Sequence, residues 1–415
     1  MPRVVFLAPE PIRPRMAGMG IRALELARAL QTGGFDVDLL VGNDPGEARE
    51  AAGSVPVTHA PPGRLAAAAG AADAAVVSGH AANDWFREAP GVPVAADLYD
   101  PFPIENLHYV ASLGEGAAGI DRAAFSLSLA RADFFLCASP AQRLFYAGAL
   151  YDAGRVGPKN FPADPGLADL LAVVPFGAPE APARGDARAG REAAGAAGAG
   201  PVVLFGGIYD WYDPTPVLEA WPRILERHPA ARLLFFDSPN PETTPQRLHA
   251  LARERARSLD PGGRSILFSP WLPYERRADL YAGCDLLVSV SSPGLEADLA
   301  FRTRLLDAAW GGVPSVSVAG GALADALERE GAGVSVEREP PAIAAVVAAL
   351  LADPPRRATL SQNARRFAAE RTWRRVAAPL ADWCRRARID PNRRPVPGGK
   401  GPSVWSRLFG GDRDP

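Results

Sequence analysis

The chain has 415 residues, of which 47% are hydrophobic, so it is long enough to bury the cores of two domains. Its formal net charge of −2 argues against a general nucleic-acid binder, because such proteins usually carry an evident basic face. All but two of the basic residues are arginines, which together with abundant Ala and Gly suggests a high-GC bacterial genome. Lys159 lies in a Pro-rich loop and Lys400 in the tail, so neither fits a Schiff-base or P-loop lysine.

The sequence contains no pattern typical of a disulfide framework, a metal site or a membrane segment. Cys137, Cys284 and Cys384 are odd in number and far apart, which fits neither disulfides nor zinc. The apolar run 4–8 is too short for the core of a signal peptide, and no run approaches the roughly 18 apolar residues of a membrane helix. We therefore expect a cytoplasmic protein that needs no cofactor.

Strand-like apolar runs alternate with helical patterns along the chain, which predicts α/β architecture with two doubly wound, Rossmann-like parallel sheets. The stretch 184–200, rich in Ala, Gly and Arg, breaks this alternation, so we place the domain boundary near it. Two such sheets facing each other imply a ligand site in the cleft, at the carboxyl ends of the strands. The predicted strands are residues 4–8, 37–41, 74–78, 93–98, 134–138 and 171–174 in the first half, and 202–205, 232–236, 265–268, 286–290, 315–318 and 333–336 in the second.

The most informative segment is 293–314, which forms the crossover between two predicted strands. Its helix is expected to begin near Asp298, and a helix start offers unpaired NH groups and a partial positive charge to a phosphate. Arg302 and Arg304 could add fixed charge, and Asp307 could accept hydrogen bonds from a ribose. The alternative is that the two arginines and the aspartate form a solvated helix face.

This segment resembles the nucleotide-sugar site of retaining family 4 glycosyltransferases, which have the GT-B fold. Their pattern is Glu, seven residues, Glu, and then a small-Gly-x-Pro ending; residues 307–314 fit its second half, with Asp in place of Glu. Leu299 stands where the first Glu is expected, and the nearest acids are Glu296 and Asp298. The spacing is similar to that of a divergent subgroup with a Glu-Thr-x-x-Ala-Phe-Arg-Thr-Arg-x-Leu-Asp run, although Ala297 replaces its Thr.

Two segments of the first half extend the resemblance. Gly18, Gly20 and Arg22 follow the first predicted strand, where the family has a glycine loop whose backbone approaches the donor phosphate or the acceptor. A plain strand-to-helix turn is the alternative, because the third glycine of a dinucleotide fingerprint is missing. Asp100 follows the strand 93–98, where many relatives present His-Asp to the sugar, but Asp before Pro is also an ordinary turn former.

Two segments of the second half also match the family. Gly206 and Gly207 follow the first strand of this half, and adjacent glycines let backbone NH groups approach a diphosphate. Relatives follow this turn with Arg and Lys that grip the phosphates; these are absent here, so one of the two arginines in 293–314 would have to compensate. Trp271 and Leu272 match a loop that borders the nucleobase in relatives, with packing against the next helix as the alternative.

The resemblance implies a GT-B glycosyltransferase (EC 2.4) that moves a hexose-like sugar, with retention and without a metal, from a nucleoside diphosphate sugar to a glycan, lipid-linked or secondary-metabolite acceptor, as in polysaccharide assembly. Charge on the departing diphosphate must then be stabilised. Residues 1–182 would form the acceptor domain, completed by a crossing helix at about 372–388, and 183–371 the donor domain. The implied catalytic residues are Glu296, Arg302, Arg304 and Asp100; the donor-binding residues are Gly206, Gly207, Asp298, Leu299, Ala300, Phe301, Asp307, Trp271 and Leu272; the glycine loop is Gly18, Gly20 and Arg22.

Two other functions stay open at this stage. A nucleotide-sugar epimerase shares the architecture, and the missing basic pair and altered acid spacing also allow a nucleotide-sugar-binding protein whose catalytic site has decayed. The tail 389–415, rich in Pro, Gly and Arg, is expected to be disordered. Its apolar residues could share one face of a short helix, which would allow weak peripheral contact with the inner face of the cell membrane or with a partner. These residues are Val404, Trp405, Leu408 and Phe409.

Overall fold

The computed structural model describes residues 1–89, 91–198, 200–207, 209–241, 244–318 and 321–394. The chain divides into two compact units, Met1–Phe176 with Trp373–Pro415, and Gly177–Thr372. Residues 177–182 therefore belong to the second unit, whereas the sequence analysis assigned them to the first. They do so because Ala178 pairs with Thr372 in a parallel bridge and the carbonyl of Ala181 accepts a 2.8 Å hydrogen bond from the indole of Trp310.

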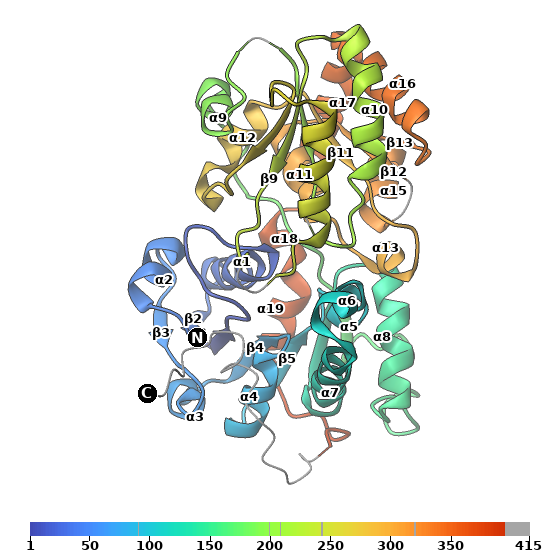
Figure 1. The fold of residues 1–415 in the computed structure, drawn as a ribbon. Helices are drawn as coiled ribbons and strands as arrows, with labels where there is room; N and C mark the ends of the chain where they lie inside the picture. Colours follow the sequence, from blue (N-terminus) through green and yellow to red (C-terminus); the bar gives the residue numbers. More distant parts are fainter. Residues whose placement is uncertain (90, 199, 208, 242–243, 319–320, 395–415) are drawn as a thin grey trace, which may run out of the picture. The chain divides into compact units, whose positions relative to one another are not determined.

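The first unit is built on a seven-stranded sheet in which every pairing is parallel (Figure 1). Its central strands are buried on both faces, which explains why they are continuous apolar runs in the sequence. The edge strand β3 was not predicted, because it has only three residues and none of them is fully buried. In sheet order the strands are β3 (Val57–His59), β2 (Asp36–Val41), β1 (Arg3–Leu7), β4 (Ala74–Ser78), β5 (Val94–Asp97), β6 (Phe134–Cys137) and β7 (Leu171–Val173).

Helices join these strands, and the chain returns to the first unit at Trp373. The single helix expected at about 372–388 is instead two short helices, because Pro379 has no NH group and occupies the first turn of the second one. The helical segments are α1 (Gly18–Thr32), α2 (Pro45–Ala52), α3 (Leu65–Ala69), α4 (Ala81–Glu88), α5 (Phe102–Glu105), η1 (Asn106–Tyr109), α6 (Val110–Leu113), α7 (Glu115–Arg131), α8 (Pro140–Asp152), α18 (Trp373–Val376) and α19 (Ala378–Cys384).

The second unit repeats the plan with a six-stranded parallel sheet, β10 (Ile266–Ser269), β9 (Arg232–Phe236), β8 (Val202–Phe205), β11 (Leu286–Ser289), β12 (Ser315–Val318) and β13 (Gly333–Val336). All twelve predicted strands are present, each within one residue at either end, and the predicted α/β class is confirmed. Its helical segments are α9 (Ala187–Ala193), α10 (Thr215–Arg227), α11 (Arg247–Leu259), η2 (Tyr274–Arg276), α12 (Arg277–Ala282), α13 (Leu295–Leu299), α14 (Thr303–Gly311), α15 (Ala322–Arg329), α16 (Pro340–Ala352) and α17 (Pro354–Ala369).

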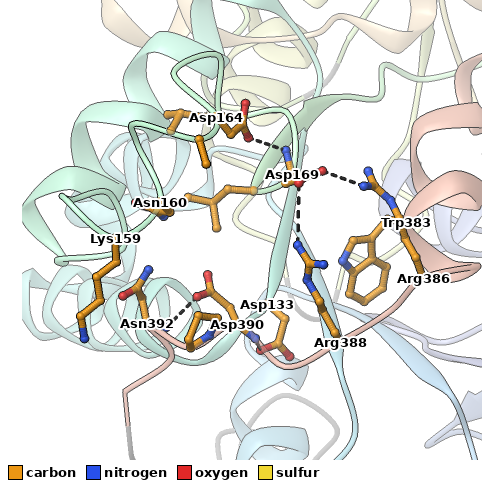
Figure 2. Close-up of a pocket in the computed structure, with 14 residues that line it drawn as sticks. Asp133, Lys159, Asn160, Asp164, Asp169, Trp383, Arg386, Arg388, Asp390 and Asn392 are labelled. Carbon is orange, nitrogen blue, oxygen red and sulfur yellow. Dashed lines mark hydrogen bonds and ion pairs between the residues drawn. The ribbon is translucent and has the colours of Figure 1, made fainter.

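The segment after α19 closes the amino-terminal edge of the first sheet, as Figure 2 shows. Asp133, immediately before β6, accepts hydrogen bonds from the backbone of Asp390 at 2.9 Å and from Arg393 at 3.0 Å. Arg386 and Arg388 both point at Asp169, at 2.8 and 3.7 Å. The pocket between these residues lies at the edge opposite the carboxyl ends of the strands, and its charged side chains pair largely with one another. It therefore anchors the returning segment.

The sequence-based expectations for the tail extend beyond this segment. Residues 395–415, with Trp405 and its apolar neighbours, lie outside the described residues. Among the helices of the described part, none is both long and apolar enough to span a bilayer.

Arg22 on α1 is fully buried and holds the carboxyl edge of the first sheet together. Its Nε and Nη2 atoms donate to the carboxylate of Asp97 at 2.6 and 3.0 Å, and its Nη2 and Nη1 atoms donate to the carbonyls of Val174 and Pro175 at 2.8 and 2.9 Å. The guanidinium carbon also lies 4.5 Å from the ring centroid of Tyr99. The sequence analysis placed Arg22 in a ligand-binding loop, but these contacts use four of its five donor hydrogens.

We predict that Arg22→Met lowers the free energy of unfolding by about 3–5 kcal/mol, because it leaves the buried carboxylate of Asp97 without its counter-charge. Urea denaturation followed by circular dichroism measures this loss. The double variant Arg22→Met/Asp97→Leu should recover much of it, since both buried charges are then gone. A loss below about 1 kcal/mol in the single variant would show that the pair is not a structural element.

Candidate active site

The residues predicted to bind the donor follow three strands of the second sheet at their carboxyl ends. Gly206 and Gly207 follow β8, Trp271 follows β10, and the segment 293–302 follows β11. The chain runs outward from β8 through β9 to β10 on one side, and from β11 through β12 to β13 on the other. Strands β8 and β11 thus flank the switch point of the sheet, where open α/β sheets bind ligands.

The crossover after β11 contains two helices, which corrects the expectation of one helix starting near Asp298. Helix α13 already begins at Leu295, because Gly294 adopts a φ of 142° that lets the chain turn early. It ends at Leu299, and α14 starts only at Thr303. The predicted phosphate-binding NH groups of residues 299–301 are therefore not at a helix start. The NH of Ala300, for example, donates to the carbonyl oxygen of Glu296 at 2.8 Å.

Glu296 and Arg302 form a buried, bidentate ion pair across this interruption. The Nη1 and Nη2 atoms of Arg302 donate to the two carboxylate oxygens of Glu296 at 2.8 and 2.7 Å, and both side chains are less than a tenth exposed. In a continuous helix, side chains six residues apart point about 120° apart around the axis and do not face each other, so this pair requires the break. Asp298, in contrast, is exposed to solvent. The structure thus joins two predicted catalytic residues to each other.

The glycine turn after β8 is locked to the same ion pair through Tyr212. A Cβ atom on Gly207 would lie 2.1 Å from the Tyr212 ring, and the guanidinium carbon of Arg302 lies 4.7 Å from the centroid of that ring. Tyr212 also bridges to Ser291, which follows β11. Gly206 donates to the carbonyl of Val288 in β11 at 2.8 Å. The two loops at the switch point therefore hold one another in place.

The helix that follows the glycine turn is already capped by a carboxylate. The Oδ1 atom of Asp213 accepts a 2.9 Å hydrogen bond from the NH of Thr215, the first residue of α10, and Asp213 also pairs with Arg338. The carboxylate thus takes an NH group that a phosphate would need, and it takes the charge of Arg338 as well. The start of α10 is thus a poor phosphate site, in keeping with the missing basic pair.

Arg304 lies over the loop that was predicted to border a nucleobase. Its guanidinium carbon is 4.2 Å from the ring centroid of Trp271, and it also lies beside the hydroxyl of Tyr281. Burial alone lowers the pKa of Arg304, but Tyr281 and Asp307 outweigh that effect and raise it above its usual value. Leu272, next to Trp271, is half-buried. Arg304 therefore stays charged and lies over an aromatic ring.

Asp307 on α14 is a buried carboxylate. Only 8% of the residue is exposed, and burial raises its pKa despite the nearby charges of Arg277 and Arg304. Its Oδ1 atom lies 3.9 Å from the Nε atom of Arg277, which is too far for a hydrogen bond. Within the described part of the chain, this Nε atom is buried without a hydrogen-bond partner. The Asp307 carboxylate and the Arg277 guanidinium thus attract each other by charge, but no hydrogen bond joins these two atoms.

Sequence reasoning missed Arg277. Its guanidinium carbon lies 3.6 Å from the ring centroid of Tyr274 and 4.8 Å from that of Trp310, so two aromatic rings orient it. The only sequence signal is the Arg276–Arg277 pair after the Trp271 loop, which alone is indistinguishable from a solvated helix start.

The other predicted site residues lie in the first unit. Gly18 begins α1 with open space where a Cβ would be, whereas Gly20 donates its NH to Glu10 at 2.5 Å and has no room for a side chain. Asp100 follows β5 and shares a hydrogen bond with Glu105. Burial raises the pKa of Asp100, and that hydrogen bond opposes the rise. These residues share the carboxyl edge of the first sheet, and their roles stay predictions.

Comparison with known proteins assigns a class to this architecture. Residues 200–353 match the family model described as glycosyl transferases group 1. No curated protein sequence matches the chain. Several solved structures are similar in fold to this chain over more than nine-tenths of its length. HepE from Anabaena, in complex with UDP and glucose, has a TM-score of 0.67 at 18% identity and covers 91% of this chain and 98% of its own. Sucrose-phosphate synthase from Thermosynechococcus elongatus has a TM-score of 0.64 at 17% identity, covering 93% and 99%.

A third solved structure, WaaG, a glycosyltransferase involved in lipopolysaccharide biosynthesis, has a TM-score of 0.57 at 17% identity and covers 91% of this chain and 98% of its own. These neighbours are GT-B glycosyltransferases, so the predicted fold is confirmed. The family match lies within the second unit, which therefore carries a glycosyltransferase group 1 domain.

The interlock of the glycine turn predicts that Gly207→Ala lowers stability by about 1–3 kcal/mol, because the new methyl group overlaps the Tyr212 ring. Gly18→Ala is the matched control, since a Cβ there meets no atom within 4 Å. Thermal unfolding of both variants decides the point. Equal melting temperatures for the two variants would contradict the interlock.

The raised pKa of Asp307 predicts an unusual pH effect on stability. Ionising this carboxyl costs free energy in the folded protein at every pH above its raised pKa, so Asp307→Asn should melt above the parent at pH 7. The difference should shrink as the pH falls through that pKa toward about 4, the ordinary range of a carboxyl. Asp298→Asn, at an exposed position, should show no such trend. A variant at Asp307 that melts below the parent at pH 7 would contradict this account.

Proposed function

We propose that the protein transfers a hexose-like sugar from a nucleoside diphosphate sugar to a hydroxyl of a glycan, lipid-linked or small-molecule acceptor, with retention of configuration. The observation that carries this proposal is that the buried Asp307 carboxylate and the Arg277 Nε atom face each other at 3.9 Å without a hydrogen bond. A hydroxyl group both donates and accepts hydrogen bonds, so one ribose hydroxyl placed there would satisfy the carboxylate and the guanidinium together. Asp307 is also the position that the family 4 resemblance assigns to the ribose.

The proposal assigns the rest of the donor to other residues of the second unit. Trp271 and Leu272 would border the base, as the resemblance implies. Glu296 keeps unused lone pairs beyond its two bonds to Arg302, and these would accept hydrogen bonds from sugar hydroxyls. Arg302 thus acts by orienting Glu296 and by balancing its charge.

The departing diphosphate needs positive charge, since the transition state separates it from an oxocarbenium-like carbon. Arg304 is charged and lies on α14, three residues before Asp307, the proposed ribose contact. The first NH groups of α14 have no partner within the helix and add a partial positive charge. The proposal assigns leaving-group stabilisation to Arg304 and this helix start in place of the glycine turn after β8, and it requires no metal ion or cofactor. As in the resembling family, the leaving phosphate would take the acceptor's proton.

The acceptor would bind at the carboxyl edge of the first unit, near Asp100 and the Gly18–Gly20 turn. The solved HepE structures contain UDP with glucose and UDP-glucose, which makes UDP-sugars the first donors to test. We place the activity in the cytoplasm, with weak contact of the tail at the inner face of the membrane as part of the proposal. Polysaccharide or glycolipid assembly is the proposed setting.

Nucleotide-sugar binding without transfer is the second candidate, and a specific observation favours it. Asp213 caps the helix start where a diphosphate could bind, and Glu296 and Arg302 neutralise each other. A protein of this kind would bind the donor but turn over nothing. An epimerase would instead convert the donor in the absence of an acceptor, which separates it from both.

A thermal-shift screen against UDP, GDP, ADP and TDP and their common sugars tests the proposal. A ligand at 100 times its dissociation constant should add about 2.7 kcal/mol of stability to the parent, and none to Asp307→Ala. Arg277→Ala should lower the affinity for the same ligand by about tenfold or more, because it removes the second partner of the ribose hydroxyl. Glu275→Ala, at an exposed position two residues before Arg277, is the control.

Transfer is then measured with the nucleotide that binds, by following release of the nucleoside diphosphate with and without candidate acceptors. Release that depends on an acceptor supports a transferase. A parent protein that binds none of the nucleotides would overturn the proposed donor site.

A further inference from the structure

The loop after β8 presents a stacked pair of aromatic rings where the resembling family has cations. The ring centroids of Tyr209 and Trp211 lie 4.8 Å apart, with the ring planes inclined by only 25°. Both residues are half-buried, whereas Tyr212 of the same loop is buried. The pair packs against the core of the second unit and keeps part of its surface open. A partly exposed indole stacked on a phenol is a flat apolar surface.

The backbone fixes this surface at the switch point of the sheet. The carbonyl of Trp211 accepts a 3.2 Å hydrogen bond from the NH of Ser292, and Tyr212 bridges to Ser291. Ser292 is four residues before Glu296 in the chain. The guanidinium of Arg302 lies over the ring of Tyr212, the residue next to Trp211. The flat surface and the carboxylate of Glu296 are thus tied to the same two interlocked loops.

The chemistry of these groups is complementary to a sugar ring. A pyranose has a face of C–H groups, which packs on an aromatic ring, and an equatorial rim of hydroxyls, which donate to a carboxylate. Aromatic rings in place of cations would add little to diphosphate binding, since they carry no charge. The loop after β8 is therefore better suited to the sugar than to the phosphates.

We propose that Trp211, stacked on Tyr209, is the platform for the pyranose ring of the donor and sets which sugars are accepted. This inference rests on the proposed function, because it needs a nucleotide-sugar donor. Its distinctive consequence is that Trp211 contributes to the binding of the sugar and not to the binding of the nucleotide.

Calorimetric titration of the full chain separates the contribution of the sugar to binding from that of the nucleotide. The chain is titrated with a nucleoside diphosphate and with its sugar conjugate, and UDP and UDP-glucose are the first pair to use. In the parent, the ratio of the two affinities gives the contribution of the sugar. Trp211→Ala should reduce that ratio by at least fivefold while leaving the affinity for UDP unchanged. Trp211→Phe, which keeps an aromatic face, should retain most of the ratio. Leu295→Ala, at a position 54% exposed, is the control and should change neither affinity.

Each result bears on a different claim. An unchanged ratio in Trp211→Ala would overturn the platform, and so would an equal loss of UDP and UDP-glucose binding, since that would mark a general collapse of the loop. The melting temperature of the variant, measured without ligand, identifies such a collapse. If the parent binds none of UDP, GDP, ADP, TDP or their sugar conjugates, the proposed function itself fails and this inference falls with it.

Discussion

The buried ion pair between Glu296 and Arg302 determines the arrangement of the carboxyl edge of the second sheet. It exists only because the helix after β11 is interrupted, and it lies on the Tyr212 ring, which in turn needs a glycine at position 207. The ion pair, the helix break and the glycine turn therefore depend on one another. Removing either charged partner would leave the other buried and uncompensated, at a cost of about 3–5 kcal/mol.

This arrangement decides how the site can meet a charged donor. Asp213 occupies the helix start that nucleotide-binding folds often offer to a phosphate, whereas Arg304 and the start of α14 offer positive charge on another element. Asp307 and Arg277 supply a carboxylate and a guanidinium Nε atom that lie 3.9 Å apart without a hydrogen bond between them. Functional sites commonly keep such unpaired groups, because a ligand later provides the partner.

The sequence was sufficient to predict the sheets and the location of the candidate site, but not which groups the charged side chains of the site contact. Buried parallel strands are continuous apolar runs, so all but the short edge strand β3 could be predicted, and residues after strand ends had to gather at one edge. Arg22 and Arg302 were both predicted to serve a ligand, and the sequence did not show that each of them pairs with a buried carboxylate. Such pairings depend on side-chain reach between distant segments and, for Arg302, on a helix break that no local pattern marks.

The central claim is that the donor binds at the switch point of the second sheet. Hydrogen–deuterium exchange of the full chain, with and without the nucleoside diphosphate sugar that binds best, tests it most directly. The account predicts slower exchange in peptides that cover the turn after β8, the Trp271 loop and α13–α14, with little change at the amino-terminal edge around Asp133. Protection confined to the first unit, or no protection in α14 at saturating ligand, would contradict it.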